Sequence, residues 1–146
     1  MIDQQLGILQ RAERIARIAH AGQKEQITGD DYIEHVKRVV ALVDGEDAKT
    51  VAWLHDVIED APVTTDSLRK AGIPERIITS VWHLSRRIDE ESYAEYIQRI
   101  KASGDPLALA VKLADLKDHL RDSCPARLRA RYEAALIALA PKGVSS

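Results

Sequence analysis

The chain of 146 residues has the length of one domain, with 45% hydrophobic and 30% charged residues. This composition excludes a disordered chain. The 21 basic against 23 acidic residues give a net charge of -2, which lacks the basic excess typical of nucleic-acid-binding domains. We therefore expect one domain over residues 1–146, with a core at about 4–140, a flexible tail at 141–146 and no nucleic-acid partner.

The compartment is indicated by cysteine content and hydropathy. A single cysteine, Cys124, excludes an internal disulfide and a Cys-based zinc site, and is typical of a reducing compartment. No apolar run approaches the roughly 20 residues that span a bilayer, and residues 1–5 show no signal-peptide pattern. We expect a cytoplasmic protein without a membrane partner. No pattern indicates an oligomeric state.

The first half of the chain predicts three amphipathic helices. From a cap at Asp3, apolar residues recur at steps of three or four as far as Ala19, on one helical face. The same spacing predicts a second helix over about 33–43, closed by Gly45. A third is expected over about 46–57, because apolar positions continue until Pro62 prevents further helix.

Helix-start and helix-stop signals divide the second half into further helices. The expected segments are a short helix capped by Thr65 and ending at Gly72, a helix with Pro74 in its first turn, a helix over about 93–103 ended by Gly104, a long helix capped by Asp105 and reaching about 121, and a last helix after Pro125. Clean period-two alternation is absent from the sequence. We therefore predict an all-α fold, a single compact unit of about eight helices.

The end of the third predicted helix is the most informative place for chemistry. His55, Asp56, Glu59 and Asp60 lie within six positions, after an apolar stretch and before a turn. Burying such groups unpaired costs several kcal/mol each, so something must compensate. A divalent metal ion is one compensation, and a local hydrogen-bonded network is the other.

Two residues elsewhere bear on this choice. His35 lies on the apolar side of the second helix, and Asp115 lies inside an apolar stretch of the long helix. Asp115 needs a partner there. One interpretation pairs it with Lys112 or His119, which share its helical face.

The other interpretation brings side chains from three helices to one ion. Two imidazoles and two carboxylates without a thiolate suit Mn²⁺, Fe²⁺ or another six-coordinate divalent ion better than a closed structural zinc site. The four candidate ligands are His35, His55, Asp56 and Asp115.

This series resembles the metal-binding signature of the HD-domain phosphohydrolases, a helical superfamily. Several ordered segments are more specifically similar to the hydrolase domain of RelA/SpoT-type enzymes and their small stand-alone relatives, which remove the 3′-diphosphate of ppGpp with Mn²⁺. The matching segments are 19–23, 29–35, 53–60, 64–65, 72–74, 84–87 and 111–116. No synthetase domain is expected in addition.

The resemblance implies a role for each matching residue. The metal ligands are the four residues named above, while Glu59 and Asp60 orient or deprotonate the attacking water. Lys112 steadies a ligand or contacts phosphate, unless it is an exposed lysine with a buried stem. Arg86 and Arg87 are either a phosphate-binding pair or a solvated one.

The chain departs from the family pattern where the base is recognised. Gln26 and Ile27 replace a basic pair, and His119 replaces an asparagine one turn after the last ligand. We consider Gln26 and His119 as substrate contacts. The leading hypothesis is a phosphohydrolase of a small nucleotide, most similar to a ppGpp 3′-pyrophosphohydrolase. The alternatives are an HD phosphatase for a deoxynucleotide or NADPH, and a catalytically silent nucleotide-binding module.

Overall fold

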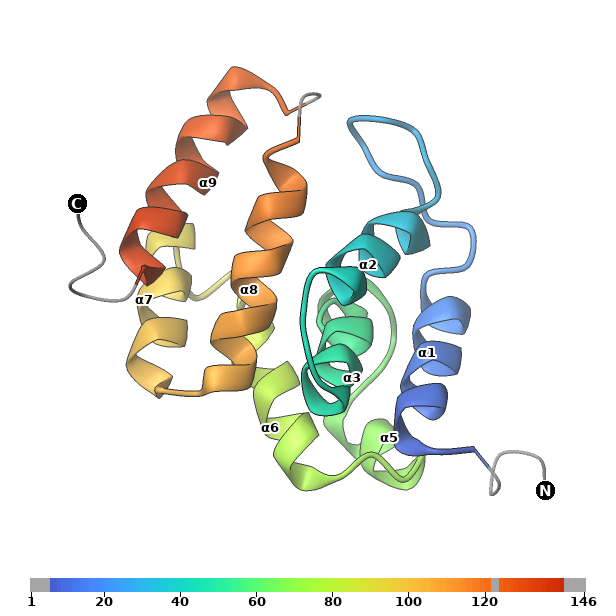
Figure 1. Cartoon of the computed structure of the whole chain (residues 1–146). Coiled ribbons are helices and arrows are strands. Elements are labelled where there is room, and N and C mark those ends of the chain that lie inside the picture. Colours follow the sequence, from blue (N-terminus) through green and yellow to red (C-terminus); the bar gives the residue numbers. More distant parts are fainter. Residues whose placement is uncertain (1–5, 122–123, 141–146) are drawn as a thin grey trace.

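The computed structural model describes residues 6–121 and 124–140, and over these residues the predicted all-α fold is confirmed (Figure 1). This part of the chain forms nine helical segments and no strand, apart from an isolated bridge between Lys24 and Asp31. The predicted tail at 141–146 and the predicted cap Asp3 lie outside the described residues.

Most of the helices follow one another through short connections, and a longer loop of residues 20–31 joins the first two. They are α1 (Ile8–Ala19), α2 (Tyr32–Ala41), α3 (Glu46–Leu54), α4 (Val57–Asp60), α5 (Thr65–Lys70), α6 (Glu75–Leu84), α7 (Tyr93–Ser103), α8 (Pro106–His119) and α9 (Ala126–Leu139).

The helix expected over 46–57 is interrupted, which accounts for the extra segment. Helix α3 ends at Leu54, and Asp56 takes a non-helical backbone conformation (φ -112°, ψ 0°) before α4 begins. The ring Nδ1 of His55 donates to the carbonyl of Ala52 at 2.6 Å. This side-chain contact satisfies a carbonyl at the end of α3, where His55 still has a helical backbone conformation and Asp56 is the residue that departs from it.

Most of the predicted helix ends are close to the observed ones. Asp105 caps α8, with its side chain accepting from the N–H groups of Leu107 and Ala108, and Gly104 ends α7 in the left-handed conformation (φ 66°). Two predicted starts were wrong by one residue: Thr64 rather than Thr65 caps α5, and Pro74 precedes α6 rather than lying in its first turn. Helix α1 begins at Ile8, later than the expected start near residue 3.

Helix α3 lies at the centre of the molecule, with α1, α2, α6 and α8 packed around it. Its residues from Thr50 to Leu54 are all buried. Figure 1 shows α7, α8 and α9 together on one side and α1 to α5 on the other. Because α8 also contacts α2 and α3, residues near its C-terminal end face the second helix and the break after α3. None of the described helices has the length and hydropathy needed to cross a membrane.

Candidate metal centre

The four predicted ligand residues lie together in the structure. Each offers an atom to a group whose members all lie within 4.8 Å of one another. His35 Nε2 is 2.9 Å from Asp115 Oδ1, and His55 Nε2 is 3.3 Å from the same oxygen. His55 Nε2 also lies 3.0 Å from Asp56 Oδ2. Helices α2 and α8 and the break between α3 and α4 therefore place two imidazoles and two carboxylates around one point.

The hydrogen bonds of the two histidines leave their Nε2 atoms suited to bind a cation. The Nδ1 of His35 is 2.6 Å from Asp118 Oδ2, and the Nδ1 of His55 is 2.6 Å from the carbonyl of Ala52. Both partners only accept, so each Nδ1 carries the hydrogen. In the neutral rings the Nε2 lone pairs then face carboxylate oxygens, an arrangement that a divalent cation at this point would stabilise.

The electrostatics of the centre also favour a positive charge. Burial opposes protonation of His35, but the hydrogen bonds with Asp115 and Asp118 raise its pKa to about 9. Burial likewise opposes protonation of His55, while the charge of Asp56 raises its pKa well above the usual value. The carboxylates thus hold protons on two imidazoles, and a divalent ion would compete for the same place.

Asp115 has both of the partners on its own helix that were considered from the sequence. Its Oδ2 accepts from Lys112 Nζ at 2.9 Å, and its Oδ1 lies 3.3 Å from His119 Nε2. Lys112 is buried, with Nζ 5.0 Å from the ring centroid of Tyr96, so the alternative of an exposed lysine is wrong. Its charge, acting against the effect of burial, holds the pKa of Asp115 well below the usual value.

Two further carboxylates lie beside the centre, on α4. Burial and then the negative charge of Asp56 raise the pKa of Glu59 to about 7 and that of Asp60 to about 6. The Glu59 side chain accepts from the backbone N–H of Arg86. Both groups therefore change charge close to neutral pH, which suits groups that accept protons during catalysis.

A cavity of about 600 Å³ adjoins these residues. Asp60 and His119 lie on its wall. So do Gln26 and Ile27, the two positions at which the sequence differs from the family pattern. The remaining lining residues are Gln23, Lys24, Glu25, Tyr32, Leu128 and Tyr132. The rings of His35, His119 and Tyr132 stack in sequence, with centroid distances of 4.6 and 4.9 Å, so one aromatic column leads from the centre to the cavity wall.

The two arginines of the predicted basic pair, Arg86 and Arg87, lie in different environments. The backbone of Arg86 contacts Glu59, and its guanidinium lies 5.4 Å from the centroid of the Tyr93 ring. The guanidinium of Arg87 lies over the Trp82 ring, at 4.6 Å. Neither arginine is among the residues that line the cavity beside the centre.

Two residues of the centre were not predicted from the sequence. The hydroxyl of Tyr32 donates to Asp56, and Asp118 accepts from His35. Asp118 follows Asp115 by three positions and therefore shares its helical face, which is a signal that the spacing contained. Tyr32 is three positions before His35, but an aromatic residue at a helix start indicates core packing equally well.

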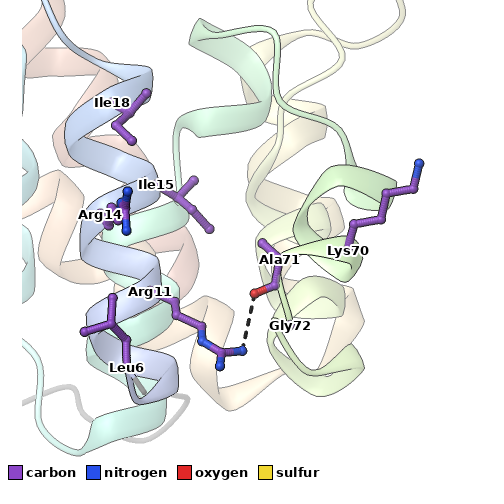
Figure 2. A pocket seen from close by; sticks show the side chains of 8 residues that line it. All are labelled: Leu6, Arg11, Arg14, Ile15, Ile18, Lys70, Ala71 and Gly72. Atoms are coloured by element: carbon purple, nitrogen blue, oxygen red, sulfur yellow. Dashed lines mark hydrogen bonds between the residues drawn. The ribbon is translucent and has the colours of Figure 1, made fainter. Parts of the chain in front are cut away.

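A second cavity, of about 460 Å³, lies elsewhere, between α1 and the end of α5 (Figure 2). Figure 2 shows Arg11 reaching from α1 toward the carbonyl oxygen of Ala71, which lies 3.5 Å from its Nη1. The wall contains no histidine or carboxylate of the centre. The cavity beside Asp60 is therefore the one in which a molecule would meet the clustered side chains.

Comparisons with known proteins agree with this architecture. No family model matches the chain. The chain is 30% identical over 118 residues to a guanosine-3′,5′-bis(diphosphate) 3′-pyrophosphohydrolase of Haemophilus influenzae; the match covers 73% of this chain and 17% of that protein. A solved structure, described as a metazoan orthologue of SpoT that hydrolyses ppGpp, superposes with a TM-score of 0.77 at 21% identity. That superposition covers 92% of this chain and 84% of the other.

Proposed function

We propose that this chain, which resembles HD-type ppGpp hydrolases in sequence and fold, is a metal-dependent phosphohydrolase that removes diphosphate from a ppGpp-like nucleotide. The observation that carries the proposal is the convergence of two Nε2 atoms and two carboxylates beside a cavity that also holds Asp60. A small nucleotide substrate and a cytoplasmic location belong to the same proposal.

The donor set fits a divalent ion, and we assign His35, His55, Asp56 and Asp115 as its ligands. Imidazole and carboxylate ligation favours Mn²⁺ or Fe²⁺ among the six-coordinate ions. When bound, such an ion supplies Lewis-acid activation of water and neutralises charge on phosphoryl oxygens. Lys112 holds Asp115 in place through its ammonium group.

Other side chains of the protein hold the water, the nucleoside and the phosphate. Glu59 and Asp60 hold the attacking water and accept its proton, because their raised pKa values lie near neutrality. Gln26 and His119 contact the nucleoside from the cavity wall. Arg86, next to Glu59, binds phosphate oxygens. Arg87 is stacked on Trp82 and supports the loop between α6 and α7, which contains both arginines.

The decisive experiment is turnover of a nucleotide panel by metal-stripped protein, with and without added Mn²⁺. The panel contains ppGpp, GTP, deoxynucleoside monophosphates and NADPH. We expect Mn²⁺-dependent release of diphosphate from ppGpp. Asp56→Ala should abolish turnover and weaken Mn²⁺ binding, because it removes one carboxylate ligand while leaving the helices intact.

The other outcomes would replace the proposal by a specific alternative. Mn²⁺-dependent turnover of a deoxynucleotide or NADPH alone would keep the centre but change the substrate, which Gln26 and Ile27 in the cavity wall would then explain. Tight nucleotide binding without turnover by the Mn²⁺-loaded protein would indicate a silent binding module. Full metal content and full turnover in Asp56→Ala would contradict the ligand assignment.

A further inference from the structure

A buried carboxylate outside the ligand set, Asp118, holds the histidine of α2. Asp118 is 5% exposed, and its Oδ2 lies 2.6 Å from His35 Nδ1. Because a carboxylate only accepts, this contact fixes the tautomer of His35 and turns Nε2 toward Asp115, 2.9 Å away. Asp118 thus determines which nitrogen of His35 faces the candidate metal centre.

Arg38 in turn holds Asp118. Its Nε donates to Asp118 Oδ1 at 2.8 Å and its Nη2 to Oδ2 at 3.2 Å, a bidentate pair. Both oxygens of Asp118 therefore have partners, and the bidentate contact fixes the plane of the carboxylate. Arg38 lies on α2, three positions after His35, so one helix supplies both the ligand and the group that orients its partner.

The same guanidinium reaches the loop that forms the cavity wall. Arg38 Nη2 lies 3.4 and 3.5 Å from the two carboxylate oxygens of Glu25. Glu25 lines the cavity, and two backbone hydrogen bonds of Glu25 close the loop. Its N–H donates to the Asp30 carbonyl at 2.8 Å, and its carbonyl accepts from the N–H of Gly29 at 2.9 Å. A continuous path of contacts therefore joins His35 to the loop that contains Gln26.

A second metal ion is the competing explanation for these residues. Glu25, His35 and Asp118 also offer atoms within 4.8 Å of one another. The guanidinium of Arg38, however, already contacts the carboxylates of both Glu25 and Asp118. A positive charge that belongs to the chain thus partly compensates the two carboxylates, and a second cation there would lie against Arg38.

We propose that Asp118 is a positioning residue for His35, and that Arg38 and Glu25 extend the same network to the cavity loop. The inference rests on the proposed function, because it takes His35 to be a metal ligand. The proposal assigns metal affinity and nucleotide binding to different residues of the network. Loss of Asp118 or Arg38 lowers metal affinity, whereas loss of the Glu25 charge loosens the cavity wall and weakens nucleotide binding without changing the metal site.

The test measures Mn²⁺ affinity by calorimetry on metal-stripped protein. We expect Asp118→Ala to weaken binding by about 10- to 100-fold, as is typical when the partner of a ligating histidine is lost. Asp118→Asn retains an acceptor oxygen for Nδ1 and should recover part of that loss. The visible absorption spectrum of the Co²⁺-loaded protein should change in Asp118→Ala, since the spectrum reports ligand geometry rather than overall stability.

Two further variants keep the test decisive if Asp118→Ala fails to fold. Arg38→Met removes the group that holds Asp118 from a half-exposed position, and should also weaken Mn²⁺ binding and alter the Co²⁺ spectrum. The matched control is Arg76→Met, which breaks a bidentate pair with Asp47 on the surface and should change neither. Circular dichroism of the metal-free proteins checks folding.

The loop part of the inference is tested with Glu25→Gln and ppGpp. The Mn²⁺-loaded variant should bind ppGpp more weakly, with Mn²⁺ affinity unchanged. Wild-type Mn²⁺ affinity in folded Arg38→Met or Asp118→Ala would overturn the positioning role, and unchanged ppGpp affinity in Glu25→Gln would overturn the loop role. Absence of Mn²⁺ binding by the wild-type protein would instead overturn the proposed function, and this inference with it.

Discussion

At the scale of single residues, Glu59 is the carboxylate whose environment best matches proton transfer. Burial and the charge of Asp56 raise its pKa to about 7, and the backbone N–H of Arg86 holds its side chain. The hydrogen-bond donor to Glu59 is the backbone of Arg86 and not a candidate metal ligand, so the group can be neutralised without removing a ligand contact. Catalysis and metal binding should therefore separate at this position.

We expect Glu59→Gln to lower kcat by about 10²- to 10⁴-fold, the usual contribution of a positioned general base. The amide retains the size of the side chain but cannot accept a proton from water. Steady-state kinetics with ppGpp and Mn²⁺ titration by calorimetry give the two readouts, and Mn²⁺ affinity should be unchanged. A variant with wild-type kcat would show that the base lies elsewhere, with Asp60 as the next residue to replace.

The sequence predicted some of these residues and missed others for identifiable reasons. His35 and Asp115 were identified because a polar group on an apolar helical face needs compensation. Asp118 was missed although it shares a helical face with Asp115, because its partners His35 and Arg38 are about 80 positions away along the chain. The same holds for Tyr32, whose hydroxyl finds Asp56 only once α2 is packed against α3.

At the scale of elements, the structure departs from the sequence pattern where the site is built. The apolar positions Val51, Leu54 and Ile58 continue a helical period through the break, so periodicity alone predicts one helix there. At the observed break the backbone of Asp56 is non-helical, and the side chain of His55 donates to the Ala52 carbonyl. By contrast, the turn between α7 and α8 was predicted, because Gly104 and Asp105 act through local geometry.

Asp105 should matter for stability and not for metal binding. Its Oδ1 accepts from two N–H groups at the start of α8, and its Oδ2 accepts from the Ser80 hydroxyl at 2.7 Å. We expect Asp105→Ala to lower the free energy of unfolding by about 1–2 kcal/mol through the lost helix cap. This corresponds to a fall in Tm of about 2–8 °C for a chain of this size.

Thermal unfolding followed by circular dichroism checks this expectation. Asp44→Ala, at an exposed position in the loop between α2 and α3, is the matched control and should leave Tm unchanged. Asp105 precedes Asp115 by ten positions on the same helix, about 15 Å along its axis, so Mn²⁺ affinity should be retained in both variants. A loss of Mn²⁺ affinity in Asp105→Ala would mean that the start of α8 sets the position of its far end.

At the scale of the whole molecule, the centre joins α8, on one side of Figure 1, to α2 and the break after α3, on the other. Helix α8 contacts α2 and α3 as well as α7 and α9, and it brings Asp115 and Asp118 to the histidines. The charges of the centre are therefore brought together only when the long-range packing forms. The global stability of the protein should then depend on how these charges are compensated.

The raised pKa values determine whether the stability of the folded protein rises or falls with pH. His35 has a folded pKa of about 9 against an ordinary value of 6.5, and Glu59 about 7 against 4.5. A group whose pKa is raised by folding stabilises the protein fully below its unfolded pKa, and this contribution is lost as the pH rises through the folded value. Without metal, the free energy of unfolding should therefore fall from about pH 4.5, where the contribution of Glu59 begins to be lost, to about pH 9, where that of His35 is lost.

Added Mn²⁺ should reverse this trend. The ion binds deprotonated ligands, so its affinity increases as protons leave the histidines, and it stabilises the folded state by about 2.7 kcal/mol when its free concentration is about 100 times Kd. The measurement is Tm of the metal-stripped protein across this pH range, with and without Mn²⁺, and His35→Gln should flatten the metal-free profile. If the metal-free Tm instead rose with pH, the histidines could not be carrying the protons that the ion replaces, and the electrostatic basis of the metal assignment would fail.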